Sequence, residues 1–573
     1  MINFKEEIIF LLSEIDILNE QINLEIPKEI SHGDFAFPCF ILSKKLKKNP
    51  FDLSKEISNK LNEINNKKNN SIIEKVENNG AYVNFFIKKN IKAKEIINSI
   101  INQSYFKFDK KNEKIMVEYS QVNTHKAFHV GHIRGTLLGS VLINLLKYYG
   151  YEVVSANYQG DTGAHVAKSL WYLKKHLNES FPNKRKGIWL GNIYKKANKL
   201  LDNEENNEKY KKEISKILQQ LENRDKELTE LWKITRKYSL DDFEEIYNLL
   251  GVSFDNYFFE SEMEEKGKNI VNELLNKKIA YYDDKAVVIN LEKYDLGVFV
   301  LLKSDGTTLY STKDLALANI KFNDFKIDKS LYVVGSEQKY HFQQLFKTLE
   351  IMGFKQAKYC KHIPYDLVNL EGGKISSREG ELILAIDFIE EIKNNALIEV
   401  KKRDNVENSE ETAKDIALSA IRFGFLNYDN NKSIIFNMKK ALDFEGETGP
   451  YIQYSYARIS SILNKLNIDV DEFINNINSI DYSLLNEDIE SELISKLMNF
   501  RDVIIYCSEN YKINLLCRYL IELSQLFNEF YHKCNIIKEK EELKKARLAL
   551  IISVQKVLFE GLSIIGIKSL NKM

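Results

Sequence analysis

The sequence predicts an α/β protein in which a parallel-sheet domain stands between an N-terminal α+β domain and a C-terminal all-α helical bundle. Three observations predict it. A chain of 573 residues is too long for a single core. From Lys114 strand, glycine-containing loop and helix alternate, which is typical of a parallel sheet. After about residue 385 the pattern is almost wholly helical.

The first 110 residues mix helical periodicity with one strand-like run. That run is "AYVNFFI", residues 81–87, and basic clusters such as "KKLKKN" lie between the elements. This mixture of helix and strand favours a small α+β domain. We therefore expect an N-terminal domain over residues 1–110.

A βαβ unit opens the central domain, which we expect over residues 111–385. "KIMVEYS" is the first strand, apolar residues then recur at helical spacing from Ile133 until Gly150, and "EVVSANY" is the second strand. Residues of about 175–240 are rich in Lys, Glu and Asn and predict a solvent-exposed helical insertion. Strand signals return at "KAVVINL", "GVFVLLK" and "SLYVVGS". A helical connector at 386–440 and an all-α domain at 441–573 complete the expected order.

Composition excludes several classes of protein. No apolar run approaches the roughly 20 residues of a membrane span, and the acidic N-terminus "MINFKEEIIFLLSEIDILNE" argues against secretory and transit peptides. The five cysteines include no CxxC pair, so neither a disulfide framework nor a zinc site is indicated. Lys+Arg and Asp+Glu both total 82, which leaves nucleic-acid binding open because binding depends on local basic surface. We expect a cytoplasmic protein with no membrane partner.

Two of the nine histidines stand where the first crossover helix should begin. His129 and His132 flank Gly131, and Lys126 precedes them. A helix N-terminus carries unpaired N–H groups and a positive dipole end, so it attracts anions. Imidazoles placed there can donate to phosphate oxygens. A metal-binding pair and two unremarkable loop histidines are the alternatives, and the spacing by itself does not exclude them.

The "HVGH" segment in this position resembles the HIGH signature of class I aminoacyl-tRNA synthetases. A later segment, "GGKISSREG" at 372–380, resembles their KMSKS signature, although such a sequence by itself is typical of an exposed charged turn. The resemblance implies a Rossmann-like catalytic domain in which His129, Gly131 and His132 face the ATP α-phosphate. Lys374, with Ser376 beside it, would close over the pyrophosphate. ATP, with Mg²⁺, is then a substrate, and no tightly bound cofactor or protein metal site is expected.

Five further segments are similar to arginyl-tRNA synthetases in the right order along nearly the whole chain: "GDFAFP", "SQVNTHKAFHVGHIRG", "SDGTTLYSTKDLALA", "YVVGSEQKYHFQQLF" and "LDFEGETGPYIQYSYARI". The resemblance implies an arginine-tRNA ligase. Such an enzyme activates L-arginine with ATP to arginyl-adenylate and transfers it to the 3′ end of tRNA(Arg), releasing AMP and pyrophosphate. It further implies that activation requires bound tRNA and that the enzyme is a monomer.

Residues of the expected arginine pocket follow from the same resemblance. Tyr310 and Asp314, four apart on one helix face, would hold the guanidinium with Glu260, while Asn123 and Gln338 would contact the α-amino and carboxylate end. A guanidinium offers five N–H donors, for which carboxylates are the natural partners. Residues 311–314 also fit a capping box, and spacing alone favours that role for Asp314. A neutral urea head, as in citrulline, would leave a buried carboxylate unpaired, so we expect strong discrimination without an editing site.

The resemblance also implies RNA contacts at both ends of the chain, since unstacked bases are recognised by stacking and edge hydrogen bonds. Aromatic residues at helical spacing are otherwise typical of a core. Residues 386–440 would contact the tRNA stem. The expected tRNA-binding residues are Asn79, Tyr82 and Asn84 at the outer corner and Tyr451, Tyr454 and Met573 at the anticodon.

One position departs from the KMSKS pattern and two rival functions remain. Ser377 replaces the second lysine, and in our interpretation Lys126 supplies that charge. A class I synthetase for glutamate, glutamine or cysteine is the first rival, but an acidic substrate would want a basic residue where Tyr310 and Asp314 stand. A catalytically silent RNA-binding relative is the second, but it should have lost parts of the nucleotide site.

Overall fold

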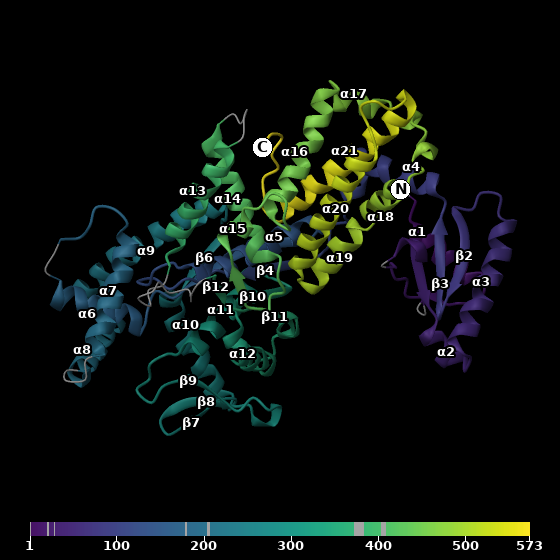
Figure 1. Cartoon of the computed structure of the whole chain (residues 1–573). Helices are drawn as coiled ribbons and strands as arrows, with labels where there is room; N and C mark the ends of the chain where they lie inside the picture. Colours follow the sequence, from purple (N-terminus) through teal and green to yellow (C-terminus); the bar gives the residue numbers. More distant parts are fainter. Residues whose placement is uncertain are drawn as a thin grey trace.

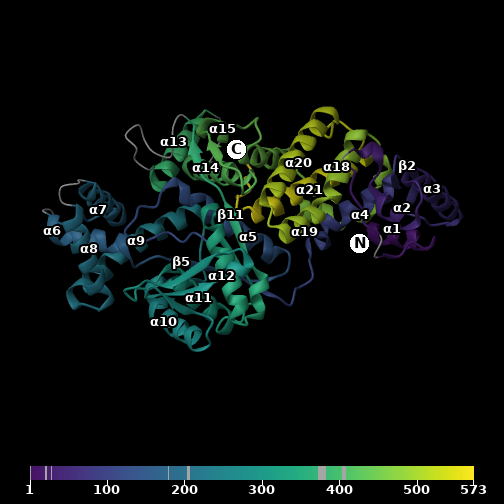
Figure 2. The ribbon, with the colours of Figure 1, turned by 90° about the horizontal axis from the view of Figure 1, so that it is seen from below.

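The molecule is elongated around a central sheet. A computed structural model describes residues 2–19, 22–27, 29–177, 180–202, 207–371, 383–402 and 408–573. In Figure 1 the helices α6 to α8 lie at one end and the N-terminal elements at the other, with the sheet and the C-terminal helices between them. The view from below keeps this order (Figure 2). No helix in these ranges is both long and apolar enough to cross a bilayer.

The central sheet has five parallel strands in the order β11-β10-β4-β5-β6. Its strands are β4 (Lys114–Glu118), β5 (Glu152–Gln159), β6 (Asn256–Phe259), β10 (Lys329–Gly335) and β11 (Cys360–Tyr365). The chain lays β5 and β6 on one side of β4, and β10 and β11 on the other. The strand order therefore reverses between β4 and β10, and in open parallel sheets ligands bind at the carboxyl ends of the strands at such a point.

Helix α5 (Val130–Tyr148) forms the middle of the molecule and is buried along most of its length. Two glycines let neighbouring rings approach its backbone: a Cβ would come 2.6 Å from the Tyr365 ring at Gly135 and 2.2 Å from Tyr119 at Gly139. On its other sides α5 contacts α13, α14, α19, α20 and α21. A helix covered on all sides needs apolar residues all round, as its sequence has.

Two expected strands lie in a sheet of their own. β8 (Ala286–Asn290) and β9 (Val298–Leu302) pair antiparallel, with β7 (Tyr281–Asp283) on the far side of β8. The connection holds only the short turn η4 (Glu292–Tyr294), whereas a parallel crossover needs about a dozen residues or more. A further strand, β13 (Ile434–Phe436), pairs with β12 (Val368–Leu370), so the part of the chain after residue 385 is not wholly helical.

The helical insertion is largely exposed, as its composition predicts, but part of its last helix is buried. Its helices are α6 (Ala164–His176), α7 (Lys186–Leu201), α8 (Asn207–Glu222) and α9 (Lys226–Leu250). Helix α9 buries Thr235, Ser239, Phe243 and Tyr247, and it packs on the loop that follows β4. The predicted exposure holds over most of the described residues in 175–240, and Thr235 and Ser239 of α9 depart from it because their hydroxyl groups are used as buried hydrogen-bonding groups.

The remaining elements build the two ends of the chain and the α-helices of the central domain. The N-terminal sheet has the antiparallel order β1-β3-β2. Its elements are α1 (Phe4–Ser13), β1 (Phe35–Pro38), α2 (Phe40–Leu46), α3 (Pro50–Lys67), β2 (Ile73–Asn79), β3 (Tyr82–Ile87) and α4 (Lys89–Ile101). Centrally there follow α10 (Glu260–Asn276), α11 (Tyr310–Asn323), α12 (Lys339–Ile351), α13 (Ala385–Lys401), α14 (Ser409–Leu426) and α15 (Met438–Ala441). The C-terminal helices are α16 (Gly449–Lys465), α17 (Val470–Asn475), α18 (Asp488–Met498), α19 (Phe500–Asn510), α20 (Ile513–Lys533) and α21 (Glu541–Ile564).

Buried polar bonds join the N-terminal sheet to the C-terminal helices. The Lys92 ammonium contacts Asp34 at 2.6 Å and the Ser495 hydroxyl at 2.9 Å. Tyr105 donates to the carbonyl oxygens of Leu497 and Met498. One hydrophobic cluster also runs through all three regions, so the N-terminal and C-terminal regions pack on each other directly.

Lys92→Met should destabilise this junction. It leaves the buried Asp34 carboxylate without its cation, and breaking a buried pair on one side costs about 3 kcal/mol or more. We expect the thermal unfolding midpoint to fall by several degrees, measured by calorimetry. Lys48→Met, which breaks an exposed pair with Glu56, is the control and should change the midpoint little.

Candidate functional site

The loop from Tyr119 to His129 joins β4 to α5 and is held from several directions. Thr124 N–H donates to the Gly160 carbonyl at the end of β5 (2.9 Å). The His125 backbone N–H donates to Ser239, and the His125 ring bonds Thr235, both on α9. Ser120, Gln121 and His125 adopt positive φ angles of 74°, 54° and 64°. Left-handed conformations at non-glycine residues are strained and persist only where surrounding contacts fix them, so this loop is tightly specified.

His129 and His132 cap the start of α5 together. The Gly131 N–H donates to His129 Nδ1 (3.1 Å) and the His129 N–H donates to His132 Nδ1 (3.2 Å), with the two rings 3.8 Å apart. Each Nδ1 therefore acts as an acceptor, which places the proton of a neutral ring on Nε2. Both imidazoles can then donate through Nε2–H to an anion at the helix N-terminus.

The surroundings keep both rings neutral. Burial, and then the charge of Lys126, lower the pKa of His129 to about 4. Burial likewise sets the pKa of His132 well below its usual value, with His129 and Lys126 adding to the effect. Lys126 itself lies 5.6 Å from the centroid of the Tyr194 ring of α7. The site thus offers one permanent positive charge and two neutral donors.

The lysine-bearing segment of the sequence ends beside this site and begins beside β13. Lys374 and Ser376 lie outside the described residues. On the C-terminal flank, Val130 N–H donates to the Ile383 carbonyl (3.1 Å) and Ala385 N–H to the Phe128 carbonyl (3.0 Å). On the N-terminal flank, Glu371 N–H donates to the Phe436 carbonyl of β13 (3.0 Å). The segment is therefore tethered at its end to the two residues that adjoin His129.

Asn123 and Glu260 meet at Gly160. A Cβ at Gly160 would lie 2.1 Å from Asn123 Oδ1 and 3.1 Å from Glu260 Oε1, so only glycine fits between them. The other oxygen of Glu260 contacts the buried Lys313 ammonium at 2.9 Å. Burial raises the pKa of Glu260, partly opposed by Lys313. Burial also disfavours the charge of Lys313, but Glu260 and Glu264 more than offset it and raise the Lys313 pKa.

The first turn of α11 carries Tyr310 and Asp314 toward His341 of α12. Asp314 Oδ2 lies 2.6 Å from His341 Nε2, and the Tyr310 and His341 ring centroids are 4.5 Å apart. Helix α11 starts at Tyr310 without a side-chain cap, while Ser311 and Thr312 donate to carbonyl oxygens of β9. The capping-box interpretation of Asp314 is therefore wrong, because the N-cap position is Leu309, two residues before Ser311, and the hydroxyls of Ser311 and Thr312 bond the neighbouring sheet.

Gln338 ends the turn η5 (Ser336–Gln338), which follows β10 at the opposite side of the strand-order switch. Its side chain is exposed. Three functional neighbours were missed in the sequence: Gly160, Lys313 and His341. Gly160 and Lys313 stand in ordinary sequence surroundings, and His341 is a single histidine near the start of a helix. Only the approach of β5, α10, α11 and α12 gives them partners.

The expected RNA-binding residues differ in exposure. Tyr451 accepts from Asn528 (2.8 Å), and Tyr454 contacts Arg458, so both rings of α16 are partly ordered by neighbours. Met573 packs at the edge of the core. In the N-terminal hairpin Asn79 is exposed and Tyr82 half-buried, whereas Asn84 is only 4 % exposed. Asn84 therefore offers RNA little side-chain surface.

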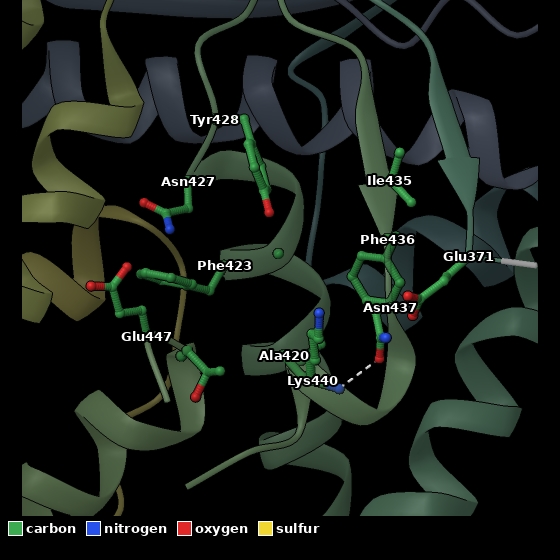
Figure 3. A pocket seen from close by; sticks show the side chains of 14 residues that line it. Glu371, Ala420, Phe423, Asn427, Tyr428, Ile435, Phe436, Asn437, Lys440 and Glu447 are labelled. Atoms are coloured by element: carbon green, nitrogen blue, oxygen red, sulfur yellow. Dashed lines mark hydrogen bonds between the residues drawn. The ribbon is translucent and has the colours of Figure 1, made fainter. Parts of the chain in front are cut away.

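A second hollow lies at the junction of the central and C-terminal regions (Figure 3). It has a volume of about 280 Å³ and is lined from α14, β13, α15 and the start of α16. Aromatic rings of Phe423 and Tyr428 face it together with the carboxylates of Glu371 and Glu447. None of the predicted catalytic or arginine-binding residues in the described chain lines it, so it is separate from the crevice described above.

Three protein families match consecutive parts of the chain. The family described as "tRNA synthetases class I (R), catalytic domain" matches residues 95–438. The "Arginyl tRNA synthetase N terminal domain" matches residues 3–87, and the "DALR anticodon binding domain" matches residues 452–573.

Relatives called "Arginine--tRNA ligase" match along the whole length. The protein of Bdellovibrio bacteriovorus is 38% identical, covering 98% of this chain and 96% of the relative. The protein of Halothermothrix orenii is 36% identical over 100% of both chains. Among solved structures, the Thermus thermophilus arginyl-tRNA synthetase has a TM-score of 0.83 with 24% identity over 99% of both chains. The latter likeness shows a shared fold.

The neutral state of His129 should make stability depend on pH. Below pH 6.5 the unfolded chain binds a proton at this histidine, whereas the folded chain does so only near pH 4. Stability is therefore lost as the pH falls through this interval. His129→Asn keeps a side chain that caps helices well. Between pH 6 and pH 5 the free energy of unfolding of this variant should fall by about 1 kcal/mol less than that of the wild type. Chemical denaturation at pH 7, 6 and 5 measures this, and an unchanged slope in the variant would contradict it.

Proposed function

The chain belongs to the arginyl-tRNA synthetase family and joins L-arginine to tRNA(Arg) at the expense of ATP, and we propose that both reactants meet in the crevice at the β4–β10 switch point. The position of Gly160 between Asn123 and Glu260 supports this proposal. The missing side chain of this glycine lets Asn123, from the histidine loop, approach Glu260. Positive charges from both sides of the proposed site act on the neighbouring His165. Its pKa is lowered first by burial and then by Lys126, on the nucleotide side, and Lys313, on the arginine side. The nucleotide side and the arginine side are therefore adjacent.

On the nucleotide side, the proposed task is stabilisation of charge. The arginine carboxylate attacks the α-phosphate of ATP, and negative charge grows on the phosphoryl oxygens and the leaving pyrophosphate. His129 and His132 donate Nε2–H groups at the N-terminus of α5, where Gly131 leaves the backbone accessible. Lys126 adds positive charge, and Lys374 with Ser376 approaches the pyrophosphate. The reaction needs positioned donors and no protein nucleophile.

Magnesium enters, in this proposal, as part of the ATP substrate. Within the described residues no group of three His, Cys, Asp or Glu side chains is arranged to hold a metal ion. Mg²⁺ is commonly held by substrate phosphates and water with few protein ligands.

On the arginine side, carboxylates provide the selection. Asp314 and Glu260, with the Tyr310 hydroxyl, hold the guanidinium, and Asn123 and Gln338 hold the α-amino and carboxylate groups. Citrulline cannot satisfy both carboxylates, because its urea head is neutral, and the unpaired buried charge would be costly. The same acids argue against a synthetase for glutamate, because they would repel the carboxylate of that substrate.

For the RNA, we propose a domain at each end of the chain and a connector between. Residues 1–110 contact the outer corner of tRNA, residues 111–385 hold the acceptor end and ATP, residues 386–440 contact the stem, and residues 441–573 bind the anticodon. Asn79 and Tyr82 serve the corner, with Asn84 behind them, and Tyr451, Tyr454 and Met573 serve the anticodon. We further propose that the enzyme is a cytoplasmic monomer and that bound tRNA is needed for activation.

Pyrophosphate exchange with each amino acid, with and without tRNA(Arg), tests the pocket. Asp314→Asn should raise the KM for arginine about 100-fold or more, because a buried guanidinium loses a charged partner, while tRNA affinity stays within about twofold. Unchanged arginine kinetics would remove Asp314 from the pocket. A lack of exchange under every condition in the wild type would favour a silent relative.

His132→Ala tests the nucleotide side. Loss of one donor aimed at the developing charge should slow single-turnover adenylate formation about 100-fold, with the arginine KM nearly unchanged. Rapid-quench measurement of adenylate separates this step from tRNA charging. Weaker tRNA binding as the sole effect would contradict the proposed site.

A further inference from the structure

We infer that His341 is the residue that aims Asp314 at the arginine guanidinium and so contributes to selection of the amino acid. The inference rests on the proposed function, because it assigns Asp314 to arginine. His341 lies on α12 and belongs to neither signature segment. We assign it a positioning role, because it acts through Asp314 and the neighbouring Tyr310 ring.

His341 contacts both residues of α11 that are assigned to the guanidinium, and its ring also packs against Phe299 of β9 at 5.7 Å. Its Nε2–H donates to Asp314 Oδ2 at 2.6 Å, and its ring meets the Tyr310 ring at 4.5 Å and an angle of 64°. The His341 side chain is 8 % exposed and that of Asp314 is 20 % exposed. One buried donor thus contacts the two residues of α11 that are assigned to the guanidinium.

The bond leaves the rest of Asp314 open to a ligand. An aspartate carboxylate turns easily about its last torsion, whose preferences are broad. With Oδ2 bound to His341, the torsion is fixed, and Oδ1 accepts no hydrogen bond from any residue in the described part of the chain. The Tyr310 side chain is 58% exposed. Oδ1 of Asp314 is therefore held in place before arginine arrives, and a carboxylate fixed in advance binds a planar guanidinium with less loss of entropy.

A purely structural role for His341 is less consistent with its surroundings. The hydrogen bonds that attach helix α12 to the region of the small sheet come from Gln344, whose amide donates to the carbonyl oxygens of Leu296 (2.8 Å) and Val298 (3.2 Å), while His341 adds only a ring contact with Phe299. His341 Nδ1 is buried and has no hydrogen-bond partner within the described chain. Leaving a ring nitrogen unpaired is unfavourable, and an apolar side chain of similar size would avoid that cost. The benefit of a histidine here lies in its bond to Asp314.

Two variants of similar volume separate the donor from the packing. His341→Gln keeps an N–H donor on a flexible arm, and His341→Met fills the space without one. We expect the Met variant to raise the KM for arginine about tenfold or more and to lower the preference for arginine over citrulline. The Gln variant should stay within about threefold of wild type. The KM for ATP and the Kd for tRNA(Arg) should change less than about twofold in both. Pyrophosphate exchange, aminoacylation and filter binding supply these values.

His362→Ala is the matched control. His362 of β11 stacks on Phe342 of α12 with the rings 4.7 Å apart and bonds the Val334 carbonyl. Its loss loosens the same helix without touching Asp314. Equal arginine KM values for the Gln and Met variants, or an effect of His362→Ala as large as that of His341→Met, would overturn the inference.

Asp314→Asn, assayed in parallel, separates the two levels of the argument. If Asp314→Asn impairs arginine use and His341→Met does not, the positioning role fails while the pocket stands. If neither variant changes arginine kinetics, the proposed pocket itself is wrong. Should His341→Met fail to fold, as judged by its thermal midpoint, His341→Leu serves as the donor-free variant, with the same expectation and the same overturning result.

Discussion

The N-terminus of α5 is the constraint on which the rest of the site depends. It must face the switch point of the sheet with donors aimed outward, and the helix must at the same time lie in the centre of the molecule. The close ring contacts at Gly135 and Gly139 fix its distance from the sheet. The buried Arg134 donates to carbonyl oxygens of Asp366, Asp429 and Lys432. These bonds hold the β11–β12 loop and the α14–β13 loop against the N-terminal half of α5.

The proposed arginine side contains carboxylates that are each held by a basic partner within the chain. Glu260 has Lys313, Asp314 has His341, and Glu118 of β4 has the fully buried Lys321 of α11. Burial raises the pKa of Glu118 and Glu260, so without these partners the acids would tend toward the neutral form. Each partner occupies one side of its acid. A guanidinium can then approach the other side. The same basic partners therefore stabilise the charged acids in the empty site and leave them able to select a cationic substrate.

The insertion has a second consequence for the chemistry. Its helix α9 bonds the signature loop through Thr235, Ser239 and Tyr247. The C-terminus of α9 is in turn bonded by the buried Arg422, which also donates to the Ile565 carbonyl at the end of α21. The strained loop of the active site is therefore supported by elements from distant parts of the chain. Local sequence supplies the loop residues, and their conformation is maintained by tertiary contacts.

By itself, the sequence determined the order of the α+β, α/β and all-α domains, the βαβ unit at residues 114–158 and the family. Hydrophobic periodicity and contiguous motifs are local properties, so they can be read directly along the chain. It placed Asn123 and His129 on one loop, and Tyr310 and Asp314 on one helix face, for the same reason. Only the tertiary structure decided that β8 and β9 leave the parallel sheet, that Thr235 and Ser239 of α9 bond the loop after β4, and that Asp314 bonds His341 in place of a helix cap. Gly160, Lys313 and His341 acquire their roles from contacts between separate elements. Such contacts depend on how strands and helices pack, which no spacing along the chain encodes.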